Sequence, residues 1–131
     1  MDLIGVGIDL VDLERVRRLL AGKGARALKR LFTEEERAYL ASRPDPTGQA
    51  AARIAAKEAV YKAMQALPDA RGIGWRDIEV ARDTGGSGRP TILLHGIAAR
   101  LAEQRGGVAI QISLSHSGTA AGAIAIVSAT G

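Results

Sequence analysis

The chain changes from strand-like to helix-like periodicity and back several times, and this order constrains its fold more than any other feature. Residues 3–10, "LIGVGIDL", alternate apolar side chains with Gly5, Gly7 and Asp9, a pattern typical of a half-buried strand. Four later segments, at 77–83, 91–95, 108–117 and 119–128, also read as strands. A Gly-rich stretch at 84–90 and a turn near residues 117–118 predict that they form two antiparallel hairpins.

Between these strands the period becomes helical. Residues 12–24 predict a helix with Leu13, Val16 and Leu20 inward, ended by Gly22 and Gly24, and a short helical piece follows at 25–32. Residues 33–41 begin with a capping-box spacing, and a loop is predicted at 42–49. A further helix runs through Arg53 to near Leu67, and another covers 96–106. The interleaved pattern predicts one α+β domain over residues 1–131, with a small, at least partly antiparallel sheet packed against helices.

Composition narrows the chemistry. Because the chain has no cysteine, disulfides and thiolate metal sites are excluded, and any metal would be held by oxygen or imidazole, which favours Mg²⁺. The formal net charge of +4 favours an anionic partner such as nucleic acid, a phosphorylated cofactor or an acidic protein. One Phe, one Trp and two Tyr disfavour single-strand nucleic-acid binding, which uses aromatic stacking platforms.

The chain opens directly on "MDLIGVGIDL" and has no apolar run near the roughly 20 residues that a membrane span requires. We therefore expect no membrane association, and a cytoplasmic location is the default expectation.

Four polar features stand out, and each has an ordinary explanation when taken alone. Asp9 could cap the helix that follows it, although Gly5 and Gly7 beside it leave room for a ligand or another backbone. Glu58 and Lys62 have the spacing of an exposed helix-surface pair. A histidine at a strand end, such as His116, is commonly a turn or surface residue. The remaining feature is a basic run in the first helix, which is typical of a solvated face or of docking to an acidic protein: Arg15, Arg17 and Arg18.

Their joint occurrence with a sequence pattern is more specific. The segments "GVGID", "RIAAKEAVYKA", "GIGWRDIEV", "GRPTILLHG" and "SLSHS" follow one another in this order, from Gly5 to Ser117. The chain resembles the holo-acyl-carrier-protein synthases, the small single-domain class of 4′-phosphopantetheinyl transferases. This resemblance implies the fold of that family and transfer of the 4′-phosphopantetheine group from coenzyme A to a serine of an apo acyl carrier protein, with release of adenosine 3′,5′-bisphosphate.

The resemblance also implies roles for particular residues. Asp9 and Glu58 would bind Mg²⁺, and Lys62 would reach the reacting phosphate from the same helix face as Glu58. Arg53 and His116, with Lys62, would bind coenzyme A. The serine proton could pass to a metal-bound water, to Glu58 or to Lys62, and this choice stays open.

The resemblance further implies docking of the acidic carrier through Arg15 and Arg18, and a homotrimer with sites between subunits. The strand at 119–128 is a candidate contact surface or an ordinary core strand. The chain departs from the family pattern at Ile54, where an aromatic is usual, at residues 64–74, where a Gly-Thr-Gly-type turn is common, and after His116. Two other readings stay open: a basic α+β nucleic-acid-binding domain, and a catalytically silent member of the same fold.

Overall fold

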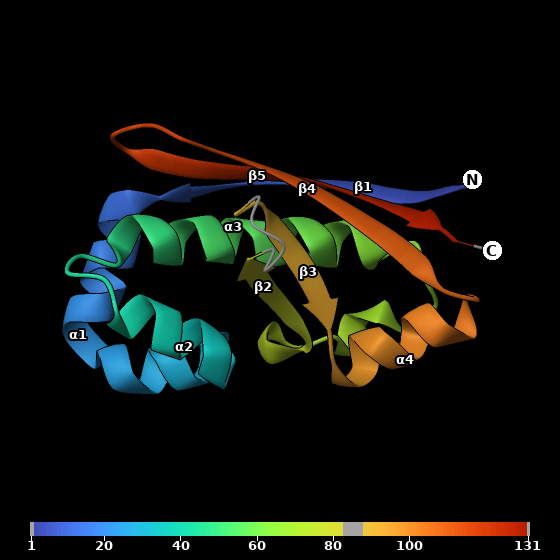
Figure 1. Ribbon diagram of the computed structural model, residues 1–131, viewed down its shortest axis with the longest axis horizontal. Helices are drawn as coiled ribbons and strands as arrows, with labels where there is room; N and C mark the ends of the chain where they lie inside the picture. The colour runs from blue at the N-terminus through green and yellow to red at the C-terminus, as the bar shows by residue number, and fades with distance from the viewer. Residues whose placement is uncertain (1, 83–87, 131) are drawn as a thin grey trace.

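The computed structural model describes residues 2–82 and 88–130, and a long central helix, α3, organises them (Figure 1). A three-stranded sheet covers one side of α3, and the other helices with a two-stranded sheet cover the opposite side. In chain order the elements are β1 (Leu3–Asp12), α1 (Leu13–Leu31), α2 (Glu34–Ala41), α3 (Thr47–Met64), the 3₁₀ turns η1 (Ala70–Gly72) and η2 (Trp75–Asp77), β2 (Ile78–Arg82), β3 (Pro90–Leu94), α4 (Gly96–Gln104), β4 (Val108–His116) and β5 (Ala120–Ala129).

Both sheets are antiparallel. The larger has the order β1-β5-β4, so the first strand of the chain pairs with the last, and the smaller pairs β2 with β3. The α+β class and both predicted hairpins are thereby confirmed, although residues 83–87 of the Gly-rich turn lie outside the described residues. Within the described part of the chain, no helix combines the length and apolarity needed to cross a membrane.

The predicted end of the first helix is wrong. Helix α1 continues through Gly22 and Gly24 to Leu31, so the short helical piece expected after them belongs to the same helix. A glycine inside a helix costs about 0.5–1 kcal/mol relative to alanine, which is too little to end a helix that packs at both ends. Val16 near its start and Leu31 at its end are both buried against α3 and its neighbours.

The end of α2 at Ala41 agrees with the prediction, whereas both ends of the helix after the predicted loop shift by a few residues. The capping box of α2 is confirmed, because Thr33 Oγ1 accepts from the Glu36 amide at 3.2 Å and Glu36 Oε1 accepts from the Thr33 amide at 2.9 Å. Helix α3 begins at Thr47, inside the predicted loop, where Asp45 Oδ1 accepts from the Thr47 amide at 3.1 Å. It ends at Met64 rather than near Leu67.

Strand β1 faces α3 with its glycines and not with its larger apolar residues. Gly7 is buried, whereas Val6, Ile8 and Leu10 are 52%, 65% and 76% exposed. A Cβ built on Gly7 would lie 1.8 Å from the carbonyl oxygen of Ala59 in α3. The room that the glycines leave is therefore filled by the α3 backbone, and the apolar side of the strand is uncovered.

Candidate active site

Asp9 reaches the surface of α3 because the strand that carries it lies directly on that helix. The close contacts of Gly5 and Gly7 with the carbonyls of Ala63 and Ala59 bring β1 against the helix backbone. Asp9 follows two residues later on the same face of the strand, and its side chain is 18% exposed. The helix that follows is capped by Asp12, whose carboxylate accepts from the Glu14 amide at 3.4 Å, so the capping interpretation of Asp9 is wrong.

Lys62 pairs with Asp9 and not with Glu58. Its Nζ donates to Asp9 Oδ1 and to the carbonyl oxygen of Ile8, both at 3.0 Å. The ordinary Glu–Lys pair that the i,i+4 spacing suggested is thus replaced by a contact between elements that are 53 residues apart in sequence. Strand β1 and helix α3 together assemble three of the predicted site residues.

Glu58 lies in the same electrostatic environment as Asp9 and Lys62. Partial burial raises the pKa of the Glu58 carboxyl, the negative charge of Asp9 raises it further, and the positive charge of Lys62 opposes both. Two carboxylates that disfavour each other's charge form a site suited to a cation, and an ammonium group already contacts one of them.

The donor set fits a hard divalent cation. Among the described residues no third carboxylate, histidine or cysteine joins the pair to make a larger metal cluster. A cation held by Asp9 and Glu58 would complete its shell with oxygens of a ligand and of water, and Mg²⁺ commonly takes only one or two protein carboxylates in this way.

Lys57, the residue before Glu58 in α3, is buried. Its side chain is 1% exposed, and Nζ donates to Glu36 Oε1 at 2.6 Å, to the Trp75 carbonyl at 2.9 Å and to the Ile78 carbonyl. Glu36 Oε2 also accepts from the Val80 amide at 2.9 Å. This buried network joins α2, α3, η2 and β2, and it fixes the helix turn that carries Glu58.

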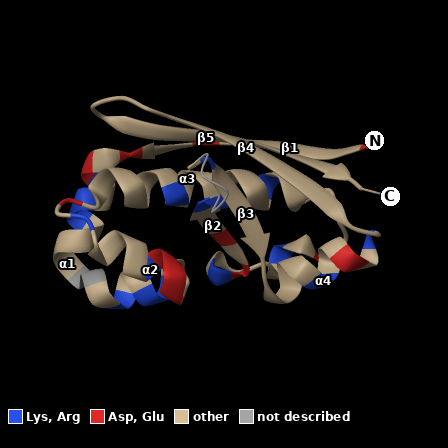
Figure 2. Ribbon diagram, viewed as in Figure 1, with Lys and Arg blue, Asp and Glu red and all other residues tan. Residues whose placement is uncertain are grey.

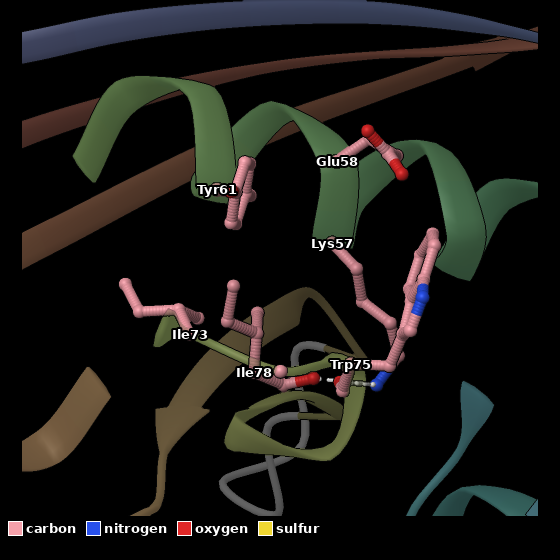
Figure 3. A pocket seen from close by; sticks show the side chains of 7 residues that line it. Lys57, Glu58, Tyr61, Ile73, Trp75 and Ile78 are labelled. Carbon is pink, nitrogen blue, oxygen red and sulfur yellow. Dashed lines mark hydrogen bonds between the residues drawn. The ribbon is translucent and has the colours of Figure 1, made fainter. Parts of the chain in front are cut away.

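A cavity of about 230 Å³ lies between α3 and the two 3₁₀ turns. Figure 3 shows the stem of Lys57 and the ring of Tyr61 on its helix side, whereas the Glu58 carboxylate points away from the other lining side chains. The opposite wall is formed by residues at the end of the 64–74 segment, which departs from the family pattern, and by residues just after it: Ile73, Gly74, Trp75 and Ile78.

Arg53, expected to bind coenzyme A, is only 8% exposed. Its guanidinium stacks on the ring of Tyr39, with Cζ 4.3 Å from the centroid, and burial lowers its pKa. Arg43 and Arg82 approach the same ring at 5.7 and 5.4 Å. The Nε of Arg53 is buried and has no hydrogen-bond partner in the described part of the molecule.

His116 is exposed at the end of β4, and the sheet register relates it to Asp9. His116 pairs with Ala121 of β5, and Ala121 pairs with Val11 of β1, so the three lie on one face of the sheet. Asp9 lies on the same face one cross-strand row away. Strand spacing puts the two Cα atoms roughly 12 Å apart, too far for their side chains to share one small ion.

Comparison with known proteins identifies the superfamily of the chain. A family profile described as the 4′-phosphopantetheinyl transferase superfamily matches residues 5–120. The chain belongs to this superfamily.

Relatives within the superfamily match over nearly the full chain. A holo-[acyl-carrier-protein] synthase of Syntrophotalea carbinolica is 48% identical over 88% of each chain, and one of Anaeromyxobacter dehalogenans is 42% identical over 98% of each. Among solved structures, the acyl carrier protein synthase of Mycobacterium tuberculosis is 37% identical with a TM-score of 0.70, covering 97% of this chain and 98% of that one. A Chronobacterium ammoniagenes synthase in complex with coenzyme A is 31% identical with a TM-score of 0.78, covering 97% and 98%.

The three arginines of the basic run on α1 differ in their partners. Arg15, Arg17 and Arg18 are all exposed, but Arg17 donates to Glu14 Oε2 at 2.6 Å. Arg15 and Arg18 take part in no ion pair between described residues.

Sequence reasoning missed the Lys57–Glu36 pair. Lys57 follows two alanines in "IAAKEA", and small residues of this kind indicate a helix face that packs closely against its neighbours. Both alanines are fully buried in the structure. The partner could not be identified because Glu36 already satisfied the capping-box pattern.

Proposed function

We propose that this protein transfers the 4′-phosphopantetheine group of coenzyme A to a serine hydroxyl of an apo acyl carrier protein. The holo carrier and adenosine 3′,5′-bisphosphate are the products. The observation that carries the proposal is the convergence of Asp9, Glu58 and Lys62 where β1 crosses α3, in a chain of the 4′-phosphopantetheinyl transferase superfamily.

The reaction is an attack by an alcohol oxygen on the β-phosphorus of a pyrophosphate. A bond forms between that phosphorus and the serine oxygen, the bond to the bridging oxygen breaks, and the serine proton passes to a base, which is Glu58, Lys62 or a water. Negative charge grows on the bridging oxygen that leaves with the adenosine bisphosphate. The ammonium of Lys62, half-exposed at the surface of α3, can stabilise this charge if it turns from Asp9 toward the phosphate.

We assign Asp9 and Glu58 as the residues that hold Mg²⁺. When bound, the ion would polarise the pyrophosphate and neutralise part of its charge. The two carboxylates come from β1 and α3, so the contact of these elements at Gly5 and Gly7 sets their separation.

Coenzyme A binding is assigned to Lys62, Arg53 and His116. The buried Arg53 guanidinium has an unpaired Nε, a group that gains from an anionic partner. His116 is exposed on the sheet face that carries Asp9. The distance between them suits an extended ligand with several phosphate groups better than a single ion.

Docking of the carrier is assigned to Arg15 and Arg18 on α1. Both guanidinium groups are exposed and free of ion pairs among the described residues, so they can attract an acidic surface. Reversing both charges, in Arg15→Glu with Arg18→Glu, should weaken carrier binding and leave coenzyme A binding unchanged. Arg17, already paired with Glu14, is the matched control. Unchanged apparent affinity for the carrier in the double variant would exclude this docking role.

A homotrimer with sites between subunits fits the uncovered side of the larger sheet. Figure 2 shows that its three strands carry few charged residues. Its outer side presents large apolar side chains from β1 and β5 (Val6, Ile8, Leu10, Ile124 and Ile126), each at least 39% exposed. Strand β5 is compatible with both expected roles, since its alanines lie in the core and its isoleucines face outward. The cytoplasmic location stays a prediction of the sequence.

The experiment that tests the function is mass spectrometry of an apo acyl carrier protein incubated with this protein, coenzyme A and Mg²⁺. Addition of one phosphopantetheine group by the wild type, but not by a folded Glu58→Ala variant, is the expected result. Glu35→Ala, which removes an exposed helix carboxylate, is the matched control and should keep activity. If the wild type modifies none of several apo carriers, the chain is a catalytically silent member of its superfamily.

A further inference from the structure

Lys62 occupies a position that its proposed role at the phosphate does not explain. In the free protein its ammonium is held by two acceptors of β1, Asp9 Oδ1 and the Ile8 carbonyl, each at 3.0 Å. The Lys62 side chain is 50% exposed, so water could have solvated it instead. Asp9 is mostly covered, so its charge gains more from a partner than that of Lys62 does.

The Ile8 carbonyl is a second hydrogen-bond acceptor for the Lys62 ammonium and so fixes its position. Strand β1 is at the edge of its sheet, with β5 on one side, and its other side offers backbone acceptors that no strand among the described residues pairs. Lys62 therefore bridges a side-chain and a backbone acceptor of adjacent residues. Two acceptors at normal distances fix the ammonium better than a single surface ion pair would.

A cation and this ammonium cannot both use Asp9 without cost. Mg²⁺ binds carboxylate oxygens at about 2.0–2.1 Å, and an ammonium 3.0 Å from the same carboxylate would then lie close to a double positive charge. Like charges this close repel strongly even with partial screening by water. Any cation that Asp9 and Glu58 hold must therefore compete with the lysine.

We propose that Lys62 is a displaceable counter-ion of Asp9: it neutralises the carboxylate in the free protein and is released toward the phosphate when a divalent cation binds. The inference rests on the proposed function, because it takes Asp9 as a metal ligand and Lys62 as a phosphate contact. Lys62 then has two positions, one before and one after the cation arrives. Its flexible stem and half-exposed side chain allow both.

The competition predicts opposite effects of one substitution on catalysis and on metal binding. Removing the lysine should lower catalytic turnover and yet tighten metal binding. The apparent affinity of the metal is reduced by the fraction of molecules in which Asp9 is free. If the ion pair is formed in about 70–90% of free molecules, removing it should lower the dissociation constant about three- to tenfold.

The test measures metal binding directly. Mn²⁺ is titrated into the folded wild type and the folded Lys62→Met variant, and free Mn²⁺ is followed by electron paramagnetic resonance without coenzyme A. Lys62→Met should bind Mn²⁺ about three- to tenfold more tightly. Lys62→Arg, which keeps the charge at this position, should bind no more tightly than the wild type. Asp9→Asn should lose the site.

A control separates contact from long-range charge. Arg15→Met removes an exposed positive charge that has no ion pair among the described residues, and it should change the Mn²⁺ dissociation constant by less than about twofold. As a second readout, the ¹⁵N resonance of the Lys62 ammonium should shift on Mg²⁺ addition, with the same midpoint as metal binding. Asp9→Asn should abolish this shift.

The outcomes distinguish this inference from the function beneath it. Equal or weaker Mn²⁺ binding by Lys62→Met, with Asp9-dependent binding in the wild type, overturns the counter-ion role and leaves the transferase proposal intact. Equal tightening by Arg15→Met also overturns it, because the effect would then be general electrostatics. Absence of Asp9-dependent Mn²⁺ binding in every variant overturns both the counter-ion role and the metal assignment.

Discussion

Replacing Gly7 with alanine should disrupt the contact that builds the site. The added Cβ would lie 1.8 Å from the Ala59 carbonyl oxygen, whereas real Cβ atoms essentially never come within 3.0 Å of such a neighbour. Strand β1 would have to move from α3 by at least 3.0 − 1.8 = 1.2 Å. The obstacle is helix backbone, so no side-chain rotation can relieve it. We expect a loss of about 3 kcal/mol in the free energy of unfolding, at the upper end for overpacked sites.

The same movement should reduce activity by more than stability explains. A displacement of 1.2 Å at Gly7 would carry Asp9, two residues on, away from Glu58, and misplacement of about 1 Å can cost 100-fold in rate. Stability is measured by urea denaturation, and activity by phosphopantetheine transfer at a temperature where the variant is folded. Gly22→Ala is the control, since its Cβ would meet nothing within 4 Å. A Gly7→Ala protein within about 1 kcal/mol of the wild type, with full activity, would refute the close-packing argument.

Three further predictions follow from single contacts. Lys57→Met should lower the free energy of unfolding by about 3–5 kcal/mol in urea denaturation, because it leaves the Glu36 carboxylate buried without its cation; a loss below about 1 kcal/mol would contradict this. Thr33→Ala should cost about 1 kcal/mol through the lost N-cap, and Thr33→Ser should restore most of it. Because the pKa of Glu58 is raised in the fold, its ionisation disfavours folding as pH rises from 4.5 through the folded pKa. Glu58→Gln should therefore raise the midpoint of thermal unfolding at neutral pH, measured with a chelator present, and this gain should vanish at acid pH. A gain of the same size at every pH would argue against a raised pKa of Glu58 in the folded protein.

Much of the fold could be predicted because local patterns and tertiary structure agree. The capping box at Thr33, the hairpin of β4 and β5 and the amphipathic helix α4 all lie where the periodicity placed them. The end of the first helix could not be predicted, because the glycine signal is local and the packing of Leu31 that overrides it is not.

The orientation of β1 shows a different limit. Alternation defines two faces of a strand but does not say which one meets the core. Here the glycine face is inside because a helix backbone requires the space, and the apolar face of Val6, Ile8 and Leu10 is left for other contacts. A prediction that considers only one chain places apolar residues in the core of that chain.

The site could be predicted in its residues but not in its pairings. The resemblance to the holo-acyl-carrier-protein synthases implied Asp9, Glu58 and Lys62, which the structure brings together through β1 and α3. The i,i+4 rule favoured a Glu58–Lys62 pair, because it considers only neighbours on one helix. The lysine instead pairs with a carboxylate from a distant strand.

The motif around Glu58 is specific because each of its positions meets a different fixed environment. Helix α3 is enclosed on several sides, so consecutive residues face different elements. Lys57 points to the buried carboxylate of Glu36, Glu58 lies in the field of Asp9, and the fully buried Ala59 has its carbonyl against Gly7 of β1. Lys62 lies one turn beyond Glu58 and reaches the same strand. Packing therefore restricts the motif independently of catalysis, and a substitution at Lys57 or Ala59 should impair the site by moving Glu58 rather than by removing a reacting group.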